Sequence, residues 1–191
     1  MLTERRTLLL VLAINAFMFV VELVLGLRAQ STGLIADSLD MLADASVYGL
    51  SLLAVGRGQG RQRRAARASG WMQIGLAGLV LLDGSRRFLF GSEPRGGWMM
   101  AVGLAALVAN VVCLALISRH REGGVHMRAS LIFSTNDTLA NAGVILSGLL
   151  VQLLDSRLPD LVIGLLIALL VLGGGRRILA ETAPTADAPR A

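Results

Sequence analysis

Six long apolar segments, separated by short polar or charged stretches, dominate the pattern along the chain. Each has about the 20 residues that an α-helix needs to cross the hydrocarbon core of a bilayer. Backbone amides cannot stay unpaired in lipid, and the alternating pattern of a membrane β-barrel is absent, so these segments are predicted to be helices. Their expected bounds are 8–27, 33–55, 71–90, 98–117, 131–154 and 161–179.

Composition supports this interpretation. Hydrophobic residues make up 54% of the 191 residues and the mean hydropathy is +0.68, which excludes a soluble enzyme and a disordered protein. The predicted fold is therefore an all-α integral membrane protein with six transmembrane helices in residues 1–180 and a short disordered tail, 181–191. We expect no C-terminal cytoplasmic domain. A signal peptide is the alternative for the first segment, but Asn15 and Glu22 have no role in a segment that is discarded.

The basic residues predict the orientation. All 18 are arginines, and most lie before the first segment, in the linker 56–70, between the fourth and fifth segments, or after the sixth. By the positive-inside rule both termini face the cytoplasm, as in a multi-pass protein of the plasma (inner) membrane. No aromatic residue interleaves with the arginines of the linker, so we expect them to contact anionic headgroups of the lipid bilayer and no nucleic acid.

Carboxylates inside the predicted spans are the most informative residues. The second segment carries Asp37, Asp40 and Asp44, whose spacings of three and four place them on one face of a helix. The fifth segment carries Asp137. A charge at the bilayer centre costs about 2.5–3.5 kcal/mol, so Asp40, Asp44 and Asp137 would together cost roughly 7–10 kcal/mol if left ionised and unpaired.

Other polar residues accompany these acids, and basic partners are missing. The chain has no lysine, and no arginine lies in the middle of a predicted span, so a cation or protons must neutralise the acids. Glu22 and Asp37 are predicted to gate access, to carry protons or simply to pack. The residues that could assist a metal or proton path are Asn15, Glu22, Asp37, Ser134, Asn136 and Asn141.

The Asp40–Asp44 pair predicts competition between metal and protons. Carboxylates one helical turn apart, about 6 Å, repel each other by roughly 2.8 kcal/mol at an effective dielectric constant of 20, so the pair is expected to hold a proton near neutral pH. A divalent ion that binds both would displace that proton. With Asp137 from the fifth segment this makes three oxygen ligands, and water, Asn136, Asn141 or Ser134 can supply a fourth.

The sequence around these acids resembles that of the cation diffusion facilitator family, whose members are membrane metal exporters. The resemblance covers almost the whole chain, through the stretches 15–26, 36–45, 83–94, Asn110, 136–146 and 159–164. It implies the family's six-helix domain and two ligands four residues apart on each of the second and fifth helices. Asp40, Asp44 and Asp137 match three of these positions.

The chain departs from the family pattern at two places. Phe133 stands where many members have the fourth ligand, and an all-oxygen site would favour a harder ion such as Mn²⁺ over Zn²⁺. Family members commonly dimerise through a cytoplasmic C-terminal domain. Here we expect any homodimer to form through the membrane helices, for instance at Gly143 and Ser147.

The leading functional hypothesis is a transporter, not an enzyme, that exports a divalent metal ion in exchange for protons. Zinc is the first candidate substrate, followed by Mn, Fe, Co and Cd. One alternative is a membrane metal sensor or subunit that has lost transport because of Phe133. Another is a CDP-alcohol-type phosphotransferase, which Asp83, Gly84 and Arg87 faintly resemble, although its motif has the opposite order.

Two smaller features complete the predictions. His120 and His126 lie beside Glu122 in the arginine-rich loop, either as solvated loop residues or as a point of access for metal. Asp83 precedes Arg86 and Arg87 by three and four residues, which predicts an ion-pair cluster at the outer interface with side chains that reach toward the headgroups.

Overall fold

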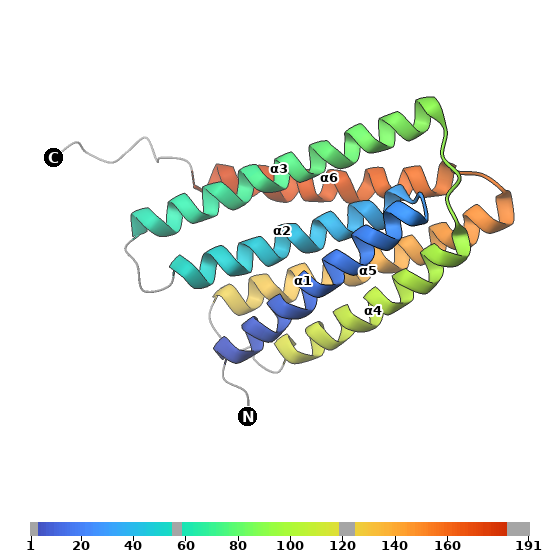
Figure 1. The fold of residues 1–191 in the computed structure, drawn as a ribbon. Helices are drawn as coiled ribbons and strands as arrows, with labels where there is room; N and C mark the ends of the chain where they lie inside the picture. The colour runs from blue at the N-terminus through green and yellow to red at the C-terminus, as the bar shows by residue number, and fades with distance from the viewer. Residues whose placement is uncertain (1–3, 55–58, 119–124, 183–191) are drawn as a thin grey trace.

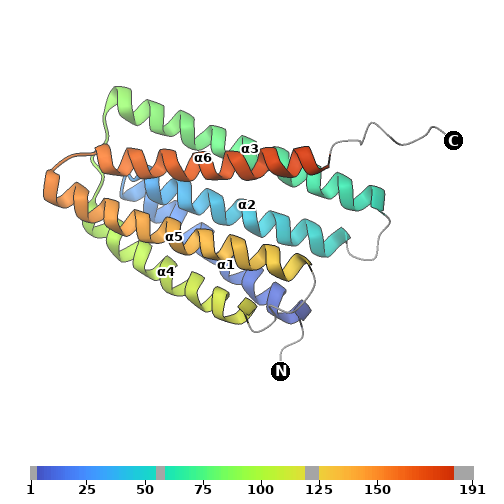
Figure 2. The same ribbon diagram turned by 180° about the vertical axis from the view of Figure 1, so that it is seen from behind.

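The computed structural model describes residues 4–54, 59–118 and 125–182, which form a bundle of long helices (Figures 1 and 2). Each helix corresponds to one predicted segment, and no strand occurs in the described ranges, so the all-α prediction is confirmed. The helices are α1 (Glu4–Arg28), α2 (Thr32–Ala54), α3 (Gln59–Phe90), α4 (Gly96–Ser118), α5 (Val125–Leu154) and α6 (Leu158–Glu181).

Five of the helices, α1 and α3 to α6, are long and apolar enough to cross a membrane. They expose large apolar side chains such as Phe17, Leu82 and Leu170, each more than 60% accessible, while many polar side chains are buried between the helices. This distribution suits a bundle surrounded by lipid. Helix α2 carries three aspartates, and its crossing of the membrane stays a prediction.

Helix α2 is the centre of the bundle. It contacts all five other helices, which no other helix does within the described ranges. Helices α3 and α6 pack together on one side of it, and α1, α4 and α5 lie on the other (Figures 1 and 2). No large hydrophobic side chain described on α2 is exposed. A helix enclosed by protein needs no lipid-facing surface, which explains how α2 can carry three acids.

The two ends of the bundle differ in charge. The start of α1 and the end of α6 lie at one end, here called the terminal end, and the turns α1–α2, α3–α4 and α5–α6 lie at the opposite, distal end (Figure 1). Exposed arginines gather at the terminal end, on the first turns of α3 and the last of α6. The start of α1 and the end of α6 are thus on one side of the bundle, and the assignment of that side to the cytoplasm stays a prediction.

Helix α3 begins earlier than the apolar pattern indicated. The expected span starts at residue 71, but the helix starts at Gln59 and includes most of the arginine-rich stretch interpreted as a linker. Arginine, alanine and glutamine have high helix propensity, so this stretch continues the helix beyond its apolar part. The hydrophobic pattern located the apolar span and missed the helical extension.

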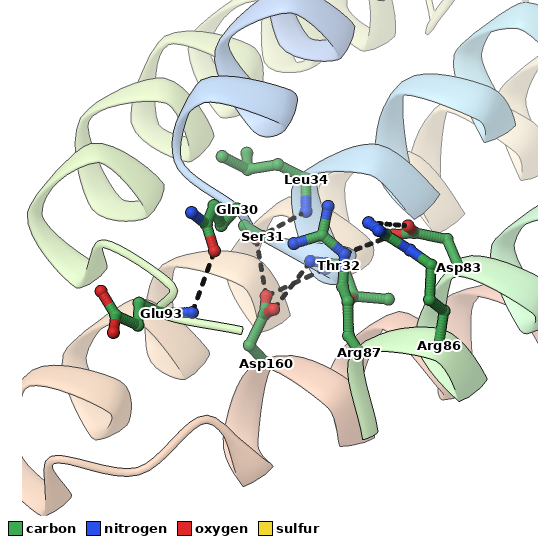
Figure 3. Close-up of polar contacts among 10 residues, drawn as sticks. Gln30, Ser31, Thr32, Leu34, Asp83, Arg86, Arg87, Glu93 and Asp160 are labelled. Atoms are coloured by element: carbon green, nitrogen blue, oxygen red, sulfur yellow. Dashed lines mark hydrogen bonds and ion pairs between the residues drawn. The ribbon is translucent and has the colours of Figure 1, made fainter. Parts of the chain in front are cut away.

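A buried carboxylate connects α6 to the first turn of α2 at the distal end (Figure 3). Asp160 accepts hydrogen bonds from the Ser31 hydroxyl at 2.6 Å, the Thr32 amide at 2.7 Å and the Gly33 amide at 2.9 Å. Ser31 Oγ also accepts from the Leu34 amide at 3.1 Å. Free amides and the helix dipole favour a negative charge at a helix N-terminus, so Asp160 holds the start of α2.

Close packing reinforces this contact between α2 and α6. A Cβ atom on Gly164 would lie 2.6 Å from Thr32 Cγ2 and 3.0 Å from its carbonyl carbon. The predicted Asp83 cluster lies nearby, and Asp83 does pair with both Arg86 and Arg87. Only Arg86 is exposed, however. Arg87 is buried and does not reach outward as expected, because it lies beside Thr32 of α2 and Asp160 of α6 (Figure 3).

The small residues suggested for a dimer contact are used inside the chain. Ser147 is completely buried. A Cβ on Gly143 would meet Ile163 of α6 at 3.4 Å. These two positions therefore help α5 pack against its own bundle, and a homodimer through the membrane helices stays a prediction.

Asp160→Ala should destabilise the protein, because it leaves two buried amides and the Ser31 hydroxyl without their acceptor. We expect a loss of about 2–3 kcal/mol, since a buried donor without a partner costs about 1–3 kcal/mol. Thermal unfolding in detergent measures it. Glu93→Ala is the control, because Glu93 is exposed and its hydrogen bond to Gln30 uses the backbone amide. Equal unfolding temperatures for both variants would contradict the role of Asp160.

Candidate functional site

Three of the predicted site residues line one small cavity inside the bundle. Asp40 and Asp44 reach it from α2 and Asp137 reaches it from α5. Gln73 of α3 completes the polar part of the wall. The remaining lining comes from α6, namely Leu170, Val171 and Gly174. The cavity volume is about 70 Å³, enough for an ion with a few water molecules.

Helix geometry explains why these acids meet. Asp40 and Asp44 are one turn apart near the middle of α2, so both face the same neighbours. Asp137 lies where α5 contacts α2. Asp44 and Asp137 are only 4% and 3% exposed, while Asp40 is half-buried at the cavity. The site thus lies where the central helix meets α3, α5 and α6.

No basic side chain neutralises these carboxylates in the part of the chain that the structure describes. The ion pairs of the described residues join Asp83 to Arg86 and Arg87, and Glu181 to Arg177. None of the hydrogen bonds formed by described side chains ends on the carboxylates of Asp40, Asp44 or Asp137. The predicted absence of a counter-charge within the chain therefore holds for the described ranges.

The acids share the cavity without forming a closed set of ligands. Among the described residues, no group of three or more His, Cys, Asp or Glu side chains is arranged to hold a metal ion. Mutual repulsion keeps like charges apart when no cation lies between them. A bound cation would therefore need the carboxylates to approach one another, or water and neutral oxygens to complete its shell.

A second pair of acids lies close to the cavity acids but does not line the cavity. Glu22 of α1 and Asp37 of α2 are 0% and 1% exposed and lie beside each other. Their four carboxyl oxygens find no partner among the other described residues. Asn15 lies two turns before Glu22 on the same face of α1. It is also buried, and its Oδ1 has no described partner. Asp37 therefore does not line the cavity, although its charge interacts with those of Asp40 and Asp137.

The auxiliary residues of α5 are only partly described. Asn141 is fully buried, and its Nδ2 donates a hydrogen bond to the Asp137 backbone carbonyl at 2.8 Å. The side chains of Ser134, Asn136 and Phe133 lie outside the described residues, as does the His126 side chain. His120 and Glu122 fall in the undescribed segment 119–124.

Gln73 was not among the predicted site residues. It is 3% exposed, and its Oε1 has no hydrogen-bond partner in the described ranges. A buried polar atom without a partner costs about 1–3 kcal/mol. The signal was present in the sequence, because Gln73 is an isolated amide within the apolar segment 71–90, but it lies far from the acids along the chain.

The sequence pattern of the family described as "Cation efflux transmembrane domain" matches residues 8–185 of this chain. The chain belongs to this family. The match covers all six helices apart from the first residues of α1, so the resemblance to the cation diffusion facilitators is confirmed.

Curated relatives of this cation efflux domain are named as metal transporters. The chain is 27% identical to the zinc transporter ZitB of Escherichia coli K12, over 93% of this chain and 61% of the relative. It is 24% identical to ZitB of Yersinia pestis, over 94% and 62%. It is 23% identical to the metal cation efflux system protein CzcD of Cupriavidus metallidurans, over 88% and 57%. The chain spans about three fifths of the length of these relatives.

Asp44→Asn should stabilise the metal-free cation efflux domain, because it removes one of several uncompensated charges from the cavity without changing the side-chain volume. Each kcal/mol of repulsion removed should raise the unfolding temperature by about 2–4 °C. The measurement is thermal unfolding in detergent at pH 8 with a chelator present.

Asp83→Asn provides the comparison of opposite sign. Asp83 has arginine partners, so its loss leaves the buried Arg87 unpaired and should lower the unfolding temperature. If Asp44→Asn lowers it to the same extent, the Asp44 carboxylate is compensated after all.

Proposed function

We propose that this cation efflux domain exports a divalent transition-metal ion from the cytoplasm across the plasma (inner) membrane in exchange for protons. One observation carries the proposal: Asp40, Asp44 and Asp137, from two helices, line a single cavity inside the bundle and have no described counter-charge. Such intramembrane acids are expensive and are typical of ion and proton pathways. Family membership favours transport over the phosphotransferase alternative.

The oxygen-rich cavity suits a cation as the transported substrate. Carboxylates bind divalent metals only when deprotonated, so metal and protons compete for the same oxygens. Zinc is the first substrate to test because the ZitB relatives are named zinc transporters. Mn, Fe, Co and Cd follow, and the described lining residues offer oxygen ligands without imidazole or thiol groups, which favours the harder ions among them.

The arrangement of helices supports alternating access. Helices α3 and α6 pack on each other and join the rest of the bundle through α2 and α5. The cavity lies at this junction, with walls from both groups. Rocking of one group against the other would open the cavity to one side of the membrane and then to the other, as in transporters whose site lies between two bundles.

The second acid pair is proposed as part of the proton path. Glu22 and Asp37 are buried side by side, and two carboxyl groups in contact form a hydrogen bond only when at least one carries a proton. Asn15 extends the polar stripe along α1. Asn136, Asn141 and Ser134 are proposed as auxiliary groups of the metal path on α5.

Replacing any cavity aspartate should abolish proton-coupled metal flux. Asp40→Ala, Asp44→Ala and Asp137→Ala are each expected to lose at least about 100-fold in rate, since a direct ligand matters at least as much as the outer-shell groups whose loss costs about 10- to 100-fold. Proteoliposomes with an imposed pH gradient and internal metal and pH indicators measure the flux for Zn²⁺, Mn²⁺, Co²⁺, Fe²⁺ and Cd²⁺.

Glu93→Gln is the matched control for these variants, because Glu93 is an exposed acid at the distal end. It should transport at the wild-type rate. Full flux in the Asp44 variant would refute the site. Metal binding by the wild type without flux of any of the five ions would instead support the sensor alternative.

Bound metal should protect the solubilised protein against heat, and the protection should shrink as the pH falls. The stabilisation follows from binding to the folded state, and protons displace the ion from the carboxylates at low pH. Unfolding temperatures with and without 1 mM metal, measured between about pH 5.5 and 8, test this. A shift of equal size at every pH would argue against proton competition.

A further inference from the structure

Gln73 is the polar side chain that α3 contributes to the cavity. It is buried, at 3% exposure, and among the described lining residues it is the one that carries an uncharged side-chain oxygen. Its Oε1 has no hydrogen-bond partner in the described ranges. Burying such an oxygen is unfavourable unless a partner arrives from outside the chain.

The surrounding helix is shaped to accommodate this amide. A Cβ on Gly174 of α6 would lie 3.1 Å from Gln73 Oε1, and a Cβ on Gly175 would lie 3.0 Å from Gln73 Cβ. A Cβ at either position would crowd the Gln73 side chain. Two consecutive glycines on α6 thus leave the space that this side chain occupies at the cavity wall.

The Gln73 amide and the three aspartates both offer oxygen atoms as metal ligands. A carbonyl oxygen is a neutral, hard ligand, of the kind that binds Mg²⁺, Ca²⁺ and Mn²⁺ beside carboxylates. It adds a ligand without adding the repulsion that a fourth carboxylate would bring. It also comes from the α3–α6 group, whereas the aspartates come from α2 and α5.

We propose that Gln73 Oε1 is a direct ligand of the transported cation and sets its preference toward a harder ion such as Mn²⁺. The inference rests on the proposed function, since it names a further ligand of the same site. Together with Asp40, Asp44 and Asp137 the amide makes a set of four oxygens from three helices. The ion itself then links the α3–α6 pair to the central helix.

The test is metal binding by the full-length chain in detergent, titrated with MnCl₂ and with ZnCl₂ at one pH by calorimetry. Gln73→Leu keeps the side-chain size but removes the oxygen, and should weaken Mn²⁺ binding at least about tenfold, by comparison with the loss of outer-shell partners. It should not lower the unfolding temperature without metal, because it removes an unsatisfied polar atom. Gln152→Leu on the exposed face of α5 is the control.

Gln73→His provides a readout that packing alone would not change. An imidazole nitrogen suits Zn²⁺ better than Mn²⁺, so this variant should shift the ratio of the two affinities toward Zn²⁺. Gln73→Glu, which keeps an oxygen at the same place, should retain binding and covers the case in which Gln73→Leu does not fold. Unchanged affinities and an unchanged ratio in all three variants would overturn the inference.

The two proposals fail in different ways. If the wild type neither binds nor transports either ion, the proposed function is wrong, and the ligand role falls with it. If the wild type binds both ions and only the aspartate variants lose binding, the transport site stands and the role of Gln73 is rejected.

Discussion

Uncompensated negative charge inside the bundle is the constraint on which the rest of this structure depends. Asp44 and Asp137 are almost wholly buried, Asp40 lies with them at the cavity, and no described arginine reaches any of the three. In lipid such charges would be very costly. The fold meets this cost by placing α2, the helix with the most acids, where every other helix contacts it. The apolar surface is left to the five surrounding helices.

Holding α2 in place is therefore as important as its chemistry. Asp160 of α6 accepts from the first amides of α2, and Gly164 lets the two helices approach so closely that a methyl group would not fit. Both contacts lie at the distal end, whereas the cavity lies nearer the middle of α2. Helices α2 and α6 are thus in close contact at one end and are separated by a polar cavity farther along. This arrangement is expected of helices that rock about a fixed point.

The two pairs of acids, Asp40 with Asp44 and Glu22 with Asp37, have different roles in the proposed mechanism. Asp40 and Asp44 face the cavity together with a residue from each neighbouring helix group, so an ion there senses the arrangement of both groups. Glu22 and Asp37 lie between α1 and α2, inside one group. In the proposed mechanism this pair holds a proton close to the cavity acids, where metal and protons compete for the same oxygens.

The amino-acid sequence alone determined the helical fold, the number of helices and the acids without a counter-charge. The length of an apolar segment, and the absence of basic residues from its middle, can both be read from that segment by itself. It also located Asp40, Asp44 and Asp137, since spacing within a helix defines its faces. It did not reveal the helical start of α3, where propensity continues the helix past the apolar part. It also did not reveal that Gly143 and Ser147 pack against their own bundle, because a small residue packs equally well inside a chain or between chains.

Only the tertiary structure decided which helix is central and which residues share a cavity. Asp37 lies beside Glu22 of α1 and does not line the cavity. Gln73 of α3 does line it, although Gln73 is more than 25 residues away from the acids in the sequence. Contacts between helices arise from how their surfaces fit, and no pattern within one segment encodes its neighbours.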